Sequence, residues 1–261
     1  MILARGLGTR MRKADDAAPV DAAQAAVADT GVKGMIPIGR PFLDYLVSAL
    51  ADAGFTDVCL VIGPEHDVVR AHYAQAGPSR VRVHFAVQQS PRGTADAVLA
   101  AESFAGDEPF VVINSDNYYP VDALRPLHLG RGPAIIAFDR DALVQLGNVP
   151  PDRVERFGAL DIGDDGCLRR ILARPTDELH ARGPIYASLN CWRFDRTIFD
   201  ACRSVPLSVR GESELPQAVQ RALDAGMRMD AIRVRAGVLD MSSRADIASV
   251  TERLRGVAVE L

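Results

Sequence analysis

A short apolar stretch at the start of the chain runs directly into a turn with two glycines, Gly6-Leu7-Gly8-Thr9-Arg10. Such a turn lets backbone amides come close to an anion, because glycine has no side chain to obstruct them. Arg12 follows in the next turn, and Lys33 lies further along the chain. The segment therefore predicts a phosphate-binding loop at the end of a strand, with an ordinary strand-to-helix turn as the alternative.

Spacing separates this turn from two other glycine-rich loops. The dinucleotide-binding fingerprint needs a third small residue three places after the second glycine, where this chain has Met11. A P-loop needs Gly-Lys-Ser or Gly-Lys-Thr, and neither string occurs in the sequence. What remains is G-x-G-T-R with a basic residue downstream.

Composition and charge limit the classes of protein to which the chain can belong. Its 261 residues are 48% hydrophobic, enough for a substantial core, and its formal net charge is −4. Nucleic-acid binding is not expected, because phosphate-backbone affinity needs clustered Lys and Arg. The four cysteines lack the C-x-x-C spacing of a metal site. No apolar run suits a signal peptide or a membrane span, so we expect a soluble, cytoplasmic protein without a membrane partner.

Short apolar runs alternate with helical patterns in the first half, a rhythm typical of a mostly parallel sheet flanked by helices. The apolar spacing over 41–53 predicts a helix that ends at Gly54. The expected strands are 57–63, 81–88 and 110–113, and a further helix is expected over 94–104. The last strand runs into Asp116, and ligands gather beyond the carboxyl ends of strands in open α/β sheets.

The second half differs, because its expected strands follow one another through turns instead of long helices, which predicts antiparallel additions to the sheet. The expected elements are strands 134–138, 158–162, 168–173, 185–194 and 229–234, and helices 214–225 and 242–254. Between Lys13 and Thr30, an alanine-rich segment predicts a short helix over 21–28, either as a flap or as a surface excursion. We expect one α/β domain over 1–261, with halves of about 1–132 and 133–261.

A second basic element is Val32-Lys33-Gly34-Met35-Ile36-Pro37-Ile38. Lys33 is one of only two lysines in a chain that otherwise uses arginine, and a compact ammonium on a flexible stem suits a phosphate. A solvated lysine is the alternative. This element resembles the P-K-x-x-L-P-V segment of the sugar-phosphate nucleotidylyltransferases, and the G-x-G-T-R turn with a basic residue downstream resembles their signature. The family includes glucose-1-phosphate thymidylyltransferase and other NDP-sugar pyrophosphorylases.

The resemblance implies a single-domain, Rossmann-like fold of the glycosyltransferase-A type. It implies a nucleoside triphosphate and a sugar 1-phosphate, or a related phosphorylated polyol, as partners. Gly6, Leu7, Gly8 and Thr9 would bind the nucleotide, and Arg10 would hold its β- and γ-phosphates. Lys33 would stabilise charge on the reacting phosphates.

Further along, Gln88-Gln89-Ser90-Pro91-Arg92-Gly93-Thr94-Ala95 resembles the family's Q-x-x-P-x-G-T-A element, which contacts the base. Gln88 suits this role because an amide offers both a donor and an acceptor. Gly93 would let the backbone approach the base, and Thr94 would begin the next helix. A polar loop with a helix cap is the alternative.

Two aspartates stand where the family carries its metal ligands. Asp116 lies in Asn114-Ser115-Asp116-Asn117, and Asp240 lies in Val238-Leu239-Asp240-Met241. The resemblance implies that they hold Mg²⁺, since a hard dication takes carboxylates together with triphosphate oxygens and waters. Asp240 by itself would be an ordinary helix-capping aspartate.

The segments that resemble the family's sugar-binding strands depart from its pattern. The resemblance implies acceptor-binding roles for Gly158, Arg174, Ser188 and Asn190. Ala173 replaces the family's glutamate, and Arg174 takes its lysine position. Asn190 stands where glycine is common, and Arg5 stands where the family has Gly or Ala. These substitutions leave the acceptor open, and Gln88 does not decide between a purine and a pyrimidine base.

The expected activity is nucleotidylyl transfer from a nucleoside triphosphate to the acceptor phosphate, giving an NDP-sugar and pyrophosphate. The alternative is a nucleotide-sugar-binding subunit of the same fold without turnover, which the departures from the family pattern favour. Pyrophosphate release that depends on a metal ion separates the two. Relatives often form dimers or tetramers, and the sequence leaves a homo-oligomer open.

Overall fold

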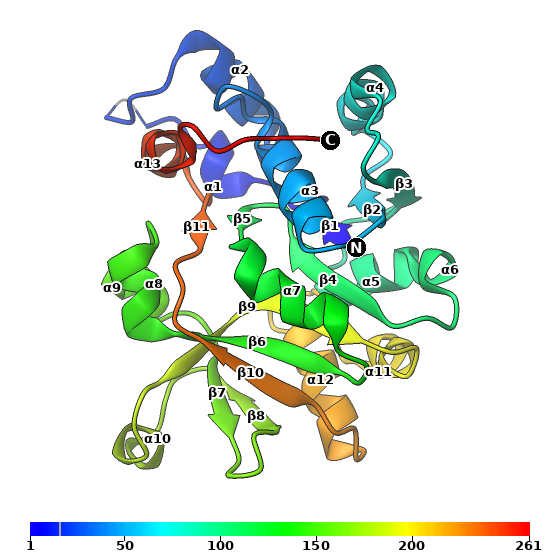
Figure 1. Ribbon diagram of the computed structural model, residues 1–261, viewed down its shortest axis with the longest axis vertical. Coiled ribbons are helices and arrows are strands. Elements are labelled where there is room, and N and C mark those ends of the chain that lie inside the picture. Colours follow the sequence, from blue (N-terminus) through cyan, green and yellow to red (C-terminus); the bar gives the residue numbers. More distant parts are fainter. Residues whose placement is uncertain (16) are drawn as a thin grey trace.

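The computed structural model describes residues 1–15 and 17–261, and its centre is a mixed nine-stranded sheet with helices on both faces (Figure 1). The strand order is β10-β6-β9-β4-β1-β2-β3, with β7 and β8 attached beside β9. The strands are β1 Ile2–Leu3, β2 Asp57–Ile62, β3 Arg82–Val87, β4 Phe110–Asn114, β6 Ala134–Asp139, β7 Ala159–Ile162, β8 Leu168–Leu172, β9 Tyr186–Phe194 and β10 Asp230–Val234.

Strand direction separates the two halves of the sheet. Strands β3, β2, β1 and β4 run parallel to one another. Strand β9 then lies antiparallel to both β4 and β6, and β7 is antiparallel to β8 and β9. The predicted parallel sheet with antiparallel additions is thus confirmed, although β10 runs parallel to β6.

Helices flank both faces of the sheet (Figure 1). They are α1 Thr9–Arg12, α2 Ala22–Thr30, the 3₁₀ turn η1 Lys33–Met35, α3 Phe42–Asp52, α4 Asp67–Ala76, α5 Thr94–Ala100, α6 Glu102–Ala105, α7 Val121–Leu129, α8 Arg140–Leu146, α9 Pro151–Val154, α10 Asp177–Ala181, α11 Ile198–Ser204, α12 Leu215–Asp224 and α13 Arg244–Leu254. In α3, Phe42, Leu46 and Leu50 recur every four residues and are buried, and Gly54, with φ 104°, follows the helix end.

Two apolar cores cover the two faces of the sheet. Ile2 and Leu60 belong to the core beneath α3 and α7, whereas their chain neighbours Leu3 and Val61 belong to the core beneath α5, α11 and α12. This split follows from the pleat, because successive side chains of a strand point to opposite faces. Strands buried on both faces read as continuous apolar runs, which is why the sequence predicted them well.

Three local features differ from the sequence-based expectations or add to them. The helix expected over 94–104 is broken at Ala101 into α5 and α6. The helix expected over 21–28 is confirmed as α2, and Asp16, in the same alanine-rich segment, lies outside the described residues. The capping box of α13 forms between Ser243 and Asp246.

A short ladder joins two distant segments beside the sheet. Strand β5 Asn117–Tyr118 pairs antiparallel with β11 Leu239–Asp240, and Asn117 is the register partner of Asp240. This pairing brings the loop that carries Asp116 next to Asp240. In the described part of the chain, no helix is both long and apolar enough to cross a bilayer.

Candidate active site

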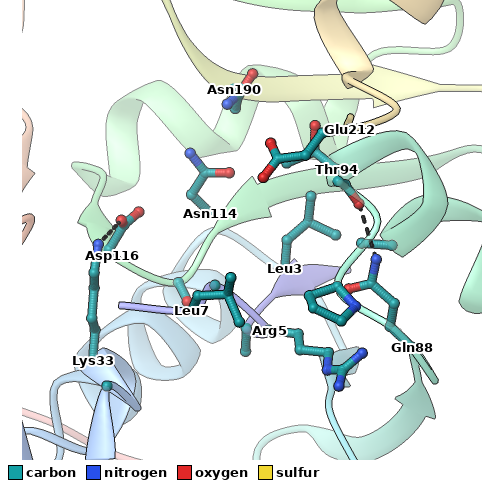
Figure 2. Close-up of a pocket in the computed structure, with 17 residues that line it drawn as sticks. Leu3, Arg5, Leu7, Lys33, Gln88, Thr94, Asn114, Asp116, Asn190 and Glu212 are labelled. Atoms are coloured by element: carbon teal, nitrogen blue, oxygen red, sulfur yellow. Dashed lines mark hydrogen bonds and ion pairs between the residues drawn. The ribbon is translucent and has the colours of Figure 1, made fainter. Parts of the chain in front are cut away.

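A cavity of about 240 Å³ opens beyond the carboxyl ends of β1, β3 and β4 (Figure 2). Its walls come from the glycine turn, the η1 turn, the segment before α5, the end of β4, the middle of β9 and the loop before α12. In Figure 2, Lys33 and Asp116 lie on one side of this cavity and Gln88 lies on the other. The cavity therefore has a charged pair on one side and the amide of Gln88 on the other.

The glycine turn is held against the segment before η1. Gly8 has φ 60°, and a Cβ on it would lie 2.4 Å from the carbonyl oxygen of Gly31. The Arg12 guanidinium donates to the carbonyl of Thr30 at 2.6 Å. Gly6 and Leu7 line the cavity, and a Cβ added to Gly6 would meet no atom within 4 Å. Glycine at position 8 is thus required by close packing, whereas Gly6 leaves space for a ligand.

Three residues of the predicted nucleotide loop, Gly8, Thr9 and Arg10, do not line the cavity. Thr9 and Arg10 form the first turn of α1, and both side chains are exposed. Neither is among the residues that line the cavity. The predicted contact between Arg10 and the β- and γ-phosphates stays a prediction.

Lys33 and Asp116 form an ion pair inside the cavity. Lys33 Nζ lies 2.8 Å from Asp116 Oδ2, and the two side chains are 14% and 25% exposed. Lys33 comes from η1 and Asp116 from the loop after β4, so the pair joins elements 83 residues apart in the chain. It places a cation on a flexible stem and a hard anionic ligand side by side, as phosphate and metal binding both require.

Asp240 is buried next to this pair but does not line the cavity. Its Oδ2 accepts a hydrogen bond from Arg153 at 2.7 Å, its Oδ1 accepts one from Asn117 at 3.1 Å, and the Ser242 hydroxyl lies within 2.9 Å of both oxygens. Burial raises the pKa of Asp240, and the charge of Asp116 raises it further.

The two carboxylates differ in how well they fit a dication. Asp116 is partly exposed in the cavity and suits an oxygen-preferring ion. Asp240 has the right charge, but Arg153, Asn117 and Ser242 already contact its oxygens, so a metal ion there would compete with these contacts. Among the described residues, no three His, Cys, Asp or Glu side chains form a metal-binding group by themselves.

Gln88 and Gly93 form the opposite side of the cavity with Thr94. The Gln88 side chain is 3% exposed and donates from Nε2 to the carbonyl of Gly93 at 3.0 Å and to Asp96 Oδ2 at 2.7 Å. Gly93 has φ 107°, and a Cβ there would lie 2.4 Å from the carbonyl oxygen of Ser213. The Thr94 hydroxyl accepts a hydrogen bond from the amide of Leu215. The predicted base-binding element thus gathers in one place.

Of the four residues predicted to bind the acceptor, Asn190 alone lines the cavity. It has φ 52°, which is rare without glycine, and its side-chain oxygen accepts a hydrogen bond from Trp192 Nε1 at 3.2 Å. Gly158 and Ser188 are joined by a backbone hydrogen bond of 2.9 Å, and Arg174 is exposed at the end of β8. The structure therefore does not gather the whole predicted acceptor site around this cavity.

Two functional candidates were missed by the sequence reasoning. Glu212 lines the cavity because the loop before α12 is tied to the segment before α5, where the Ala95 amide donates to Ser213 and the Ser213 amide donates to Arg92. Arg153, which pairs with Asp240, lies on α9. The charged string Arg210-Gly211-Glu212 before a helix was the one sequence signal for Glu212. No sequence signal pointed to Arg153.

Comparisons with known proteins agree with the fold and the motifs. A family model described as nucleotidyl transferase matches residues 26–249. Glucose-1-phosphate thymidylyltransferase of Streptomyces griseus is 28% identical over 230 residues, 87% of this chain and 57% of that protein. UTP–glucose-1-phosphate uridylyltransferase AglF of Haloferax volcanii is 27% identical over 257 residues, 98% of this chain and 96% of that protein.

A solved structure shows the same fold. It is a UDP-glucose pyrophosphorylase complexed with UDP-glucose, with a TM-score of 0.72, 17% identity and 97% coverage of each chain. The chain spans between 57% and 64% of the length of the first three curated relatives that it matches. The family model covers most of the chain, and the resemblance read from the motifs is confirmed. The chain belongs to the nucleotidyl transferase family.

Proposed function

We propose that the protein transfers a nucleotidyl group from a nucleoside triphosphate to a sugar 1-phosphate, or to a related phosphorylated polyol, with release of pyrophosphate. The observation that carries this proposal is the pairing of Lys33 with Asp116 in a cavity whose other side holds Gln88. Relatives named for thymidylyl and uridylyl transfer to glucose 1-phosphate support it. The cytoplasm is the proposed location.

The proposed mechanism needs positioning and charge neutralisation instead of a covalent nucleophile. An oxygen of the acceptor phosphate attacks the α-phosphorus, a new P–O bond forms, and the bond to the β-phosphate oxygen breaks in line. Lys33 would leave Asp116 to neutralise the reacting phosphates. The turn from Gly6 to Arg10 would hold the β- and γ-phosphates through its amides and the arginine. The base would contact Gln88.

The acceptor would enter from the side of Asn190 and Glu212, which lie across the cavity from the glycine turn. Asn190 offers an amide there, and Glu212 is a carboxylate that can accept hydrogen bonds from hydroxyl groups. Gly158, Arg174 and Ser188 stay proposed acceptor contacts, although they do not line this cavity. A polyhydroxylated phosphate ester is the ligand class that this mixture suits.

The proposed metal ion is Mg²⁺, held by Asp116, and by Asp240 after exchange of the contact with Arg153. When bound, such an ion supplies positive charge to the triphosphate and orients its oxygens. The rest of the neutralisation comes from Lys33 and Arg10. Asp116→Asn is therefore expected to lower turnover by on the order of 10²-fold or more.

The test measures pyrophosphate release with Mg²⁺, using UTP, dTTP, CTP, ATP and GTP against a panel of sugar and polyol phosphates. The expected result is release that requires one nucleotide and one acceptor together and that is lost in Asp116→Asn. Asp122→Asn is the matched control, because Asp122 is an exposed first-turn aspartate of α7. Nucleotide binding without release for every pair would overturn the proposal and favour a non-catalytic nucleotide-sugar-binding subunit.

A further inference from the structure

We infer that Asp96 is a positioning residue that fixes the amide of Gln88 in one orientation and thereby decides which kind of base the cavity accepts. The inference rests on the proposed function only in that a nucleoside triphosphate binds in this cavity with its base at Gln88. It concerns a residue outside the cavity wall, since Asp96 does not line the cavity.

The contacts of the Gln88 amide nitrogen are specific. Nε2 donates to Asp96 Oδ2 at 2.7 Å and to the carbonyl oxygen of Gly93 at 3.0 Å. Both partners are acceptors, and the Asp96 contact is a charge-assisted hydrogen bond. Figure 2 shows the amide of Gln88 at the edge of the cavity. Both N–H groups of the amide thus donate to acceptors within the protein.

A flipped amide would be strongly disfavoured. It would place Oε1, itself an acceptor, against the carboxylate of Asp96 and the carbonyl of Gly93, at the distances that now hold two hydrogen bonds. Two attractive contacts would become two repulsive ones in a side chain that is 3% exposed. Asp96 lies in the first turn of α5, so the helix backbone fixes its place next to Gln88. The amide therefore keeps one orientation.

The free atom of this amide is consequently an acceptor. Gln88 Oε1 accepts no hydrogen bond from any residue that the structure describes, and Gln88 lines the cavity. A bound base must present an N–H group to this oxygen. Uracil, thymine and guanine carry a ring N–H at the centre of their pairing edge, whereas cytosine and adenine carry a lone pair there.

A lone pair facing Oε1 would leave two acceptors in contact. Cytosine and adenine reach the oxygen only through the exocyclic amino group, which shifts the ring along its edge while the triphosphate remains bound near Lys33. The cavity is therefore expected to select bases with a central ring N–H, and Asp96 is expected to maintain that selection through Gln88.

The test uses nucleotide affinity instead of turnover. Dissociation constants for UTP and CTP are measured by calorimetry with Mg²⁺ and without an acceptor, on the full chain. Wild type is expected to prefer UTP by on the order of 10²-fold, the scale of one matched against one mismatched polar contact. N3-methyl-UTP, which lacks the N–H, is expected to bind as weakly as CTP.

In Asp96→Asn, the new amide can donate or accept, so the Gln88 amide is expected to take both orientations. The preference for UTP over CTP should fall by about 10-fold, mainly because CTP binds more tightly. Asp96→Ala leaves Gly93 as the one remaining partner of Nε2 and should also reduce the preference for UTP over CTP. Asp122→Asn, a first-turn aspartate of α7, is the matched control and should leave the preference unchanged.

A gain in CTP affinity cannot come from a partly unfolded variant, so the readout separates positioning from a merely structural role. The inference is overturned if wild type prefers CTP, or if both Asp96 variants keep the wild-type preference. Because the assay needs no acceptor, nucleotide binding without pyrophosphate release would contradict the proposed transfer and leave the inference about Asp96 intact.

Discussion

Gly93 has a backbone conformation that favours glycine, packs against the loop before α12 and lines the candidate site. Its φ of 107° and ψ of 178° lie in a region open essentially to glycine, and an alanine there would carry a strain of about 1–3 kcal/mol. The added Cβ would also lie 2.4 Å from the carbonyl oxygen of Ser213 and 2.8 Å from its amide nitrogen. These are backbone atoms, so the clash is relieved only if the loop before α12 moves away.

That movement would break three hydrogen bonds between the two segments. They are Ala95 N to Ser213 O at 2.9 Å, Ser213 N to Arg92 O at 2.7 Å and Leu215 N to Thr94 Oγ1 at 2.8 Å. At about 1 kcal/mol for each bond, the loss adds about 3 kcal/mol to the strain. The free energy of unfolding of Gly93→Ala is therefore expected to fall by about 4–6 kcal/mol, a large part of the stability of a typical domain.

The matched control is Gly77→Ala. Gly77 also has a positive φ, 56°, but a Cβ there meets nothing within 4 Å, so the expected loss is about 1–2 kcal/mol from the backbone alone. Urea unfolding followed by the fluorescence of Trp192, which is fully buried and the one tryptophan of the chain, measures both values. UTP affinity should also fall in Gly93→Ala, because the Gly93 carbonyl holds the Gln88 amide at the base side of the cavity. Losses for the two variants within about 1 kcal/mol of each other would refute the reasoning.

Three further perturbations test other parts of the structure. Lys33→Met should lower kcat by on the order of 10²-fold or more, whereas Lys13→Met should leave kcat unchanged in the same pyrophosphate assay. All four cysteines are buried, and burial raises the pKa of Cys202 to about 12. Iodoacetamide at pH 8 should therefore label the native protein far more slowly than the urea-unfolded chain, and fast labelling of the native protein would contradict the described core. Burial acts to raise the pKa of Asp161, but Arg182 and a second arginine outweigh this effect and hold the pKa below its usual value. The stabilisation that the ionised carboxylate provides is present above about pH 4 and is lost as the pH falls further. The free energy of unfolding measured from pH 6 to 3 should therefore fall less steeply in Asp161→Asn.

The parts of the fold that could be predicted are those fixed by local patterns. The strand 110–113 and the helix 41–53 were recognisable because burial on both faces, or on one helical face, leaves its period in the sequence. The break of the helix expected over 94–104 was not recognisable, because Ala101 is a strong helix former and the segment contains no Gly or Pro.

The candidate site divides in the same way. Gly8, Lys33 and Gln88 stood in segments whose order and spacing carried the resemblance, and the structure brings Lys33 and Gln88 to one cavity with the glycine turn. The pairing of Asp240 with Arg153 could not be predicted, because the two residues are 87 positions apart and nothing local to either one names the other. Only the folded chain shows that the second predicted metal ligand is already occupied.

The most direct test of the proposed reaction follows the phosphorus atoms of the nucleotide. The nucleoside triphosphate and acceptor that give pyrophosphate release are incubated with Mg²⁺ and the enzyme, once with label on the α-phosphorus and once with label on the γ-phosphorus. Nucleotidylyl transfer predicts that α-label appears in a nucleoside diphosphate joined to the acceptor and that γ-label appears only in pyrophosphate. Transfer of γ-label to the acceptor, or its release as orthophosphate, would contradict this reaction.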